Sequence, residues 1–136
     1  MGLRILVTGA TGRFGEIVPR LIARGHEVRA MTRRPCSPAA TTLRRQGATV
    51  NAGDLDDVTS LREAMAGCDA VFASGTFHRS GPSGELRHGV AIGEAARAAH
   101  VGHLVYVSGA DAGPGTGVPI FEVKGEVEAR LRRSSK

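Results

Sequence analysis

Aromatic residues and cysteine are both scarce in this chain of 136 residues. Phe, Tyr and Trp together make up 4% of the sequence, and Trp is absent. Small aliphatic side chains and Ala must therefore fill the core. The two cysteines, Cys36 and Cys68, are too few and too far apart for a CxxC redox or zinc motif, and we interpret them as reduced thiols.

Long apolar runs are also lacking. No stretch approaches the ~20 apolar residues that span a bilayer, and a strand begins at Ile5, which leaves no room for a signal peptide. We therefore expect a cytoplasmic protein that does not enter a membrane. The five histidines form no i, i+4 ligand pair on a recognisable metal helix, so we expect no metal site.

The charge balance is basic, with a formal net charge of +5. Stacking aromatics and a DNA-binding helix pattern are lacking, so nucleic acid is only a minor alternative as a partner. The excess of Arg and Lys is also suited to a phosphorylated cofactor, or it reflects an Arg-rich proteome.

Three glycines follow the first apolar run at intervals of three residues. Ile5 to Val7 form a buried strand, and Ile17 to Ala23 form an amphipathic helix after the glycines. In such a unit Gly9 allows a sharp turn, Gly12 lets backbone N–H groups approach phosphates, and Gly15 lets the helix pack close to the strand. This spacing predicts a pyrophosphate-binding turn, whereas an ordinary Gly-rich turn is the alternative.

Apolar runs and helical stretches alternate along the whole chain, which is typical of a parallel sheet with crossover helices. We expect strands over 5–8, 27–31, 49–52, 70–73 and 104–107, and helices over 14–24, 41–46, a stretch capped by Asp57 or Thr59 and running to Ala66, 87–100 and 121–132. A polar loop is expected over 74–84. Right-handed crossovers give the strand order 3-2-1-4-5. We predict an α/β, Rossmann-like three-layer sandwich, with residues 1–136 forming a single NAD(P)-binding domain.

The end of the second strand predicts the choice of cofactor. An acid there would bind the ribose 2′-hydroxyl of NAD(H), but this chain has Arg33 and Arg34 after Thr32. Guanidinium groups bind a 2′-phosphate, which a carboxylate would repel. We therefore predict NADP(H) in preference to NAD(H), with solvated surface arginines as the alternative.

Other polar residues follow the later strands at the same edge of the sheet. Asp54 and Leu55 come after the third strand, where Asp can bind the adenine amino group and Leu can pack on its ring; a turn or helix-capping Asp is the alternative. Ser74 and Gly75 come after the fourth strand, at the edge where such sheets bind ligands. His78 and His88 flank the expected loop, either as proton donors or as solvated histidines.

Taken together, these motifs resemble the NmrA-like, atypical branch of the short-chain dehydrogenase/reductase family. The matching segments are 8–15 (TGATGRFG), 31–35 (MTRRP), 53–55 (GDL), 94–101, 105–108 (VYVS) and 121–131 (FEVKGEVEARL). The resemblance implies NAD(P)H binding and, in catalytic members, reduction of small carbonyl or quinone-like substrates. Other members act as redox-responsive regulators.

The resemblance also implies roles for individual residues. Lys124 would face the nicotinamide ribose. Arg33 and Arg34 would hold the 2′-phosphate. The pyrophosphate would lie against Gly9, Thr11, Gly12, Arg13, Phe14 and Gly15.

Two features depart from the family pattern. Catalytic members use Tyr-x-x-x-Lys, but Ile120 stands four residues before Lys124, and Tyr106 is expected in the sheet or core. Ser108 follows the fifth strand, either polarising a substrate carbonyl or serving as a turn serine. Family members also continue into a further strand and a substrate lobe, whereas this sequence ends at Lys136. We expect a truncated chain, or a compact variant in which a partner or a second copy covers the fifth strand.

Three functions remain open from the sequence. The first is an NADPH-dependent oxidoreductase in which Ser108 and Lys124 assist hydride transfer to a small carbonyl or quinone-like substrate. The second is an NADP(H)-responsive regulator, which needs no proton donor. The third is a fragment that no longer binds nucleotide.

Overall fold

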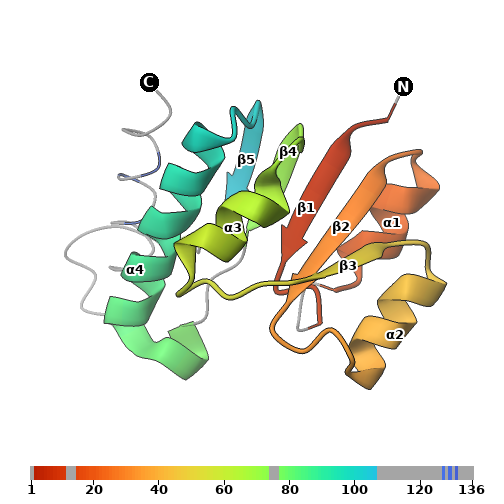
Figure 1. Ribbon diagram of the computed structural model, residues 1–136, viewed down its shortest axis with the longest axis horizontal. Helices are drawn as coiled ribbons and strands as arrows, with labels where there is room; N and C mark the ends of the chain where they lie inside the picture. The colour runs from red at the N-terminus through yellow and green to blue at the C-terminus, as the bar shows by residue number, and fades with distance from the viewer. Residues whose placement is uncertain are drawn as a thin grey trace.

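A five-stranded parallel sheet forms the centre of the protein. The computed structural model describes residues 2–11, 15–73, 77–106, 127, 129 and 131. For residues 77–82 it describes the backbone but not the side chains. The strands lie in the order β3-β2-β1-β4-β5, as the sequence predicts (Figure 1). Their bounds are β1 Arg4–Thr8, β2 Glu27–Thr32, β3 Thr49–Ala52, β4 Ala70–Ala73 and β5 His103–Tyr106.

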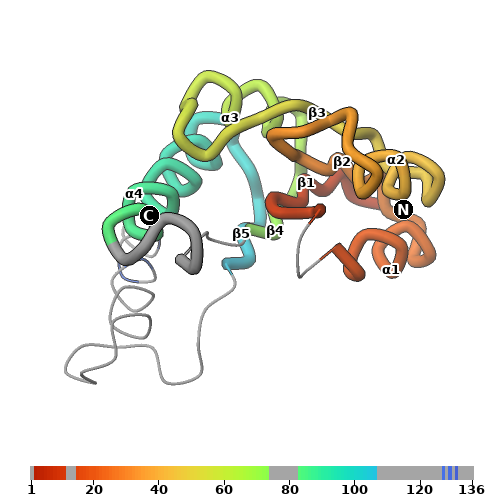
Figure 2. The backbone as a smooth tube through the Cα atoms, turned by 90° about the horizontal axis from the view of Figure 1, so that it is seen from below, coloured from red at the N-terminus to blue at the C-terminus, as the bar shows by residue number. Residues whose placement is uncertain are grey.

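Helices cover both faces of this sheet, which makes the fold a Rossmann-like α/β sandwich (Figure 2). Their bounds are α1 Ile17–Ala23, α2 Pro38–Arg45, α3 Val58–Met65 and α4 Phe77–Ala98. Among these described elements, α1 and α2 lie on one face, and α3 and α4 lie on the other (Figures 1 and 2).

Side chains of β1 alternate between two separate hydrophobic cores. Ile5 and Val7 pack with Val18 of α1 and Leu43 of α2, whereas Leu6 packs with the cluster beneath α3 and α4. Both faces of a parallel strand are buried by crossover helices, which explains the unbroken apolar run of β1. The central strand therefore anchors both layers.

Local signals in the sequence set most element ends. Ser37 caps α2, with its Oγ accepting a hydrogen bond of 3.2 Å from Ala40 N, and Pro38 follows in the first turn. This helix was predicted to begin only at Thr41. A cap residue followed by Pro is a strong start signal, because Pro lacks the N–H that is unpaired there in any case. Asp57 caps α3, one of the two residues expected to do so.

The predicted loop over 74–84 is wrong from residue 77 onward, since α4 begins at Phe77 and ends at Ala98 rather than at His100. Gly, Ser and Pro in this stretch have low helix propensity. The stretch is helical all the same, and just after it Glu85 and His88 are buried on the inner face of the helix and have partners outside it. At the other end, His100 has a φ of +58°, which is incompatible with continuing the helix.

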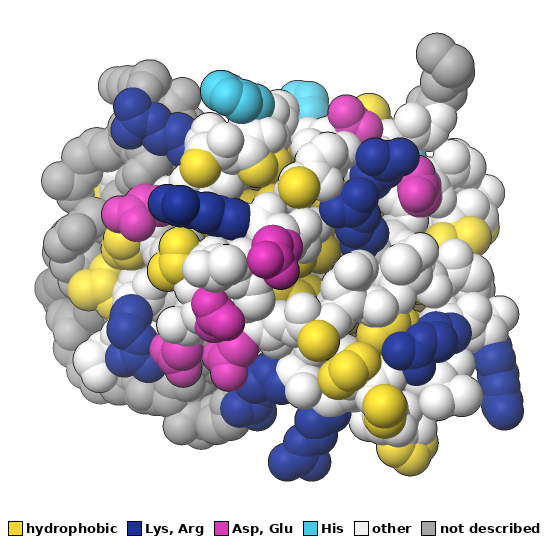
Figure 3. Space-filling model, in the orientation of Figure 1, with side chains coloured by type: hydrophobic (Ala, Val, Ile, Leu, Met, Phe, Trp, Pro, Cys, Tyr) yellow, Lys and Arg dark blue, Asp and Glu magenta, His cyan; other side chains and the backbone are white. Residues whose placement is uncertain are grey.

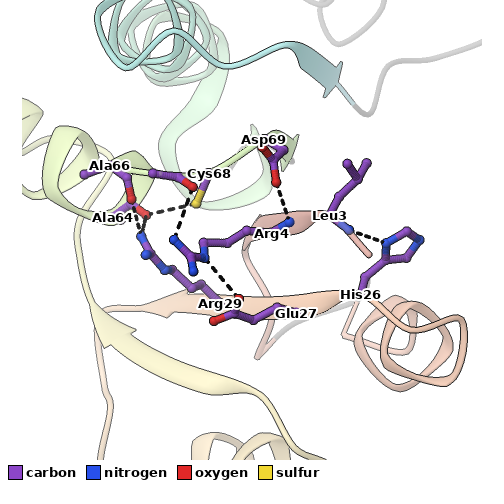
Figure 4. Close-up of polar contacts among 10 residues, drawn as sticks. Leu3, Arg4, His26, Glu27, Arg29, Ala64, Ala66, Cys68 and Asp69 are labelled. Carbon is purple, nitrogen blue, oxygen red and sulfur yellow. Dashed lines mark hydrogen bonds and ion pairs between the residues drawn. The ribbon is translucent and has the colours of Figure 1, made fainter. Parts of the chain in front are cut away.

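Two arginines join the amino end of the sheet to the C-terminal end of α3 (Figure 4). The guanidinium of Arg29 donates to the carbonyl oxygens of Ala64 at 3.0 Å and Ala66 at 2.7 Å. Arg4 donates to the carbonyl oxygen of Gly67, just past the end of α3, at 3.5 Å, and it also forms an ion pair with Glu27 at 3.1 Å. The last carbonyl groups of a helix have no partner within it and carry partial negative charge, so these cations stabilise the end of α3.

Among the described residues, no helix is both long enough and apolar enough to cross a membrane.

Candidate functional site

The candidate site lies at the edge of the sheet where the parallel strands end. The turn after β1 contains Gly9, which has a φ of +64°, so the sharp turn expected at this glycine is confirmed. Ala10 is buried, Thr11 is exposed, and the Gly15 carbonyl accepts a hydrogen bond of 3.2 Å from Val18 N at the start of α1.

A pocket of about 660 Å³ borders this turn. It lies between α1 and α2, and its lining residues include Thr11, Gly15, Arg20 and Thr42. The turn therefore adjoins open space large enough to receive part of a ligand.

A second pocket, of about 260 Å³, lies beyond the ends of β2 and β3. Its lining residues are Arg33, Ala52, Gly53, Asp54, Asp57 and Ser60. The structure thus brings together two predicted site residues, Arg33 and Asp54. Arg34 is exposed and does not line the pocket. Its backbone N–H donates a hydrogen bond to Thr32 Oγ1 at 3.1 Å. Leu55 is buried in the core beneath α3 and does not line the pocket.

Hydrogen bonds fix the turn over residues 54–57 that forms one wall of this second pocket. Asp54 Oδ1 accepts from Asp56 N at 2.8 Å, which is an Asx-turn. Ser60 Oγ accepts from Asp54 N at 3.0 Å and donates to the Asp57 carbonyl at 2.8 Å. Asp54 therefore has the turn role that the sequence left open, and contact with an adenine stays a prediction.

The other side of the turn faces α4. His88 Nε2 lies 2.7 Å from Asp56 Oδ1, and Arg87 Nη2 lies 2.8 Å from the same oxygen. Hydrogen bonds from His88 and then Arg87 lower the pKa of the Asp56 carboxyl below its ordinary value. Figure 3 shows acidic side chains grouped near the N-terminal end of α3, with basic side chains beside them.

His88 itself is only 2% exposed, so its interpretation as a solvated histidine is wrong. The sequence held a signal for this burial: His88 is four residues before Ile92, on the apolar face of the expected helix. His78 lies in α4, and its side chain is outside the described set.

A second polar pair with one buried member lies between α4 and β5. The hydroxyl of Tyr106 donates to Glu85 Oε1, and Glu85 is fully buried. Tyr106 belongs to β5, as expected. Nothing in the sequence singled out Glu85, because an acidic residue in a helix is ordinarily exposed.

The remaining predicted site residues lie outside the described residues: Gly12, Arg13, Phe14, Ser74, Gly75, Ser108 and Lys124. Within the described part of the chain, no group of three or more His, Cys, Asp or Glu residues is arranged to hold a metal ion.

The comparisons with known proteins agree with this fold. The model of the NmrA-like family matches residues 1–136. The NmrA-like family domain-containing oxidoreductase himF of Aspergillus japonicus is 34% identical over 134 residues, which cover 91% of this chain and 40% of that protein.

Two solved structures are similar over nearly the whole chain. Triphenylmethane reductase of Citrobacter sp., complexed with NADP(H), has a TM-score of 0.82 and 28% identity over 96% of this chain and 46% of its own. The negative transcriptional regulator NmrA, in complex with NADP, has a TM-score of 0.82 and 28% identity over 97% of this chain and 42% of its own. NmrA is also known in complex with NAD. The chain thus spans less than half the length of each of these proteins.

Proposed function

This chain belongs to the NmrA-like family, and from that premise we propose that it binds NADP(H) in preference to NAD(H) at the carboxyl edge of its sheet. The pyrophosphate would lie against the turn that begins at Gly9. The adenosine would enter the pocket between the ends of β2 and β3. Similar proteins that bind these dinucleotides support the ligand class.

The position of Arg33 is the observation that carries the proposal. Arg33 is exposed and lines the pocket with Gly53 and Asp54, one residue beyond the end of β2. In this fold that position lies beside the adenosine ribose. A guanidinium there offers paired N–H donors to a 2′-phosphate, and only NADP(H) carries that group.

The second part of the proposal concerns activity: we infer an oxidoreductase that acts on a small carbonyl or quinone-like substrate. Similarity to a reductase and to an NmrA-like oxidoreductase supports this class. A bound nicotinamide would supply or accept the hydride. Ser108 would hydrogen-bond the substrate carbonyl, and Lys124 would hold the nicotinamide ribose.

A regulatory role is the second candidate, because one residue favours it. Ile120 occupies the position at which catalytic short-chain dehydrogenases have Tyr, and an alkyl side chain cannot transfer a proton. Similarity to the regulator NmrA is consistent with a protein that binds the dinucleotide without turnover.

Calorimetric titration of the chain with NADPH and NADH tests cofactor binding and preference. Charge-assisted hydrogen bonds contribute about 1.5–3 kcal/mol, and Arg33 is exposed, so we expect Arg33→Gln to raise the Kd for NADPH about tenfold. The Kd for NADH should change less than twofold. Arg24→Gln is the matched control, because Arg24 is an exposed arginine after α1 at the opposite edge of the sheet.

Tighter binding of NADH than of NADPH by the unaltered chain would contradict the proposed preference. Turnover is tested separately, by following NADPH absorbance with a panel of quinones and aldehydes. A flat trace with a chain that binds NADPH would favour the regulatory role.

A further inference from the structure

The inner face of α4 carries a buried imidazole beside apolar side chains. His88 is 2% exposed, and Ile92, one turn further along, is fully buried. Burying an imidazole is costly unless its ring nitrogens find partners. Asp56 provides one, with 2.7 Å between His88 Nε2 and Asp56 Oδ1. An ionised carboxylate can only accept a hydrogen bond, so Nε2 of His88 carries the hydrogen and donates it.

Two successive hydrogen bonds lead from His88 to the wall of the second pocket. The first joins His88 to the side chain of Asp56. The second joins the backbone N–H of Asp56 to Asp54 Oδ1 at 2.8 Å. Asp54 lines the pocket, and its own N–H is held by Ser60 Oγ at 3.0 Å.

Without His88, little on that side of the turn would restrain Asp56. Its side chain is 55% exposed, and its other partner, Arg87, is 58% exposed. An exposed ion pair contributes little to holding a conformation. The buried donor of His88 is therefore the rigid contact of the two.

We propose that His88 is a positioning residue for the dinucleotide, acting through Asp56 to hold residues 54–57 in the conformation that receives the adenosine. This inference rests on the proposed function. A turn held in its binding conformation loses less conformational entropy when the ligand arrives, so affinity rises without any new contact to the ligand.

This role differs from that of Arg33 in its ligand dependence. Arg33 would contact the 2′-phosphate, which only NADP(H) has. The turn contacts the adenosine half that both dinucleotides share, so losing His88 weakens NADPH and NADH equally.

The test measures the Kd of both dinucleotides for four variants and a control, at a temperature where circular dichroism shows each to be folded. His88→Leu has similar volume but no donor, and we expect about a tenfold rise in Kd for both ligands. His88→Gln keeps an N–H donor and should stay within threefold of the unaltered chain. Asp56→Ala should match His88→Leu. Because both residues act through one contact, the double variant His88→Leu/Asp56→Ala should also raise the Kd about tenfold, rather than a hundredfold.

Arg87→Gln is the matched control, since it removes the exposed partner of the same oxygen, and we expect less than a twofold change. An unchanged Kd in both His88→Leu and Asp56→Ala would overturn the inference, as would a loss restricted to NADPH. If His88→Leu does not fold, Asp56→Ala and His88→Gln decide the question by the same criteria.

A measurement without cofactor separates this inference from the proposed function. Solvent exchange of the Asp56 amide, followed by NMR, should be at least tenfold faster in His88→Leu, and an unchanged rate would show that His88 does not hold the turn. If the unaltered chain binds neither dinucleotide, the proposed function fails, and this exchange rate still reports whether His88 holds the turn.

Discussion

Gly9 has a backbone conformation that other residues rarely adopt. Its φ is +64°, and in that region a Cβ lies too close to the following carbonyl oxygen, at a cost of about 1–2 kcal/mol. Gly102 offers a contrast, because a Cβ added there would be 3.5 Å from the Asp69 carbonyl oxygen, an ordinary contact.

We therefore expect Gly9→Ala to lower the free energy of unfolding by about 1 kcal/mol and to weaken NADPH binding. Urea denaturation and calorimetric titration measure the two effects. Gly102→Ala serves as the control and should change stability by less than about 0.5 kcal/mol. Equal stability of the two variants would contradict the assigned conformation of Gly9.

The role of an individual residue was predictable from the sequence where its neighbours in the chain determine that role. The turn glycine is one case, since the strand before it and the helix after it fix its role. The contact between Asp56 and His88 was not predictable, because the two residues are 32 positions apart. Leu55 was expected to face an adenine but is buried in the core, since an apolar residue after a strand can point to either side of the turn.

At the scale of elements, α4 packs closely against the chain segment that contains Val127. Val127 is fully buried, and a Cβ added to Gly89 would lie 2.4 Å from Val127 Cγ1 and 2.9 Å from Cγ2. Real Cβ atoms do not approach so closely, so Gly89 is what allows α4 and this segment to meet.

Gly89→Ala should consequently destabilise the chain by about 1–2 kcal/mol, because the overpacking cost exceeds the gain of roughly 1 kcal/mol in helix propensity. Thermal and urea denaturation check this. The same substitution in a Val127→Ala background should cost little or nothing, since both γ carbons are gone. A stabilising effect of Gly89→Ala in the unaltered chain would show that the two segments do not touch.

Element positions followed the sequence closely where the apolar pattern is strong. Strands β3 and β4 span the predicted residues 49–52 and 70–73. The start of α4 was missed because its first turns are poor in helix-forming residues. Its contacts with β5 and with the β3–α3 turn begin only at Glu85, further along the helix.

For the whole molecule, the opposite edges of the sheet differ in their chemistry. At the amino edge Arg4 and Arg29 bind groups that already lie in the fold, Glu27 and the carbonyls that end α3. At the carboxyl edge Arg33 is exposed in a pocket. The strand order itself was predictable, because right-handed crossovers leave few arrangements for alternating strands and helices. The link from α4 to the pocket was not, since it depends on side chains from distant elements.

Binding at that edge should stabilise the entire chain. A ligand at a hundred times its Kd raises the free energy of unfolding by about 2.7 kcal/mol if it binds only the folded state. We expect saturating NADPH to give a shift of this size in urea denaturation, and Arg33→Gln to reduce it at the same NADPH concentration. Absence of any shift with either NADPH or NADH would contradict dinucleotide binding.

Four consecutive residues between β3 and α3 have different roles: Asp54 borders the pocket, Leu55 enters the core, Asp56 reaches α4, and Asp57 caps α3 while also bordering the pocket. Adding or deleting one residue here would shift each side chain into the place of the next and leave a carboxylate facing the core. This connection should therefore keep a constant length among related sequences. Insertions should accumulate instead in connections whose side chains do not each have a fixed position.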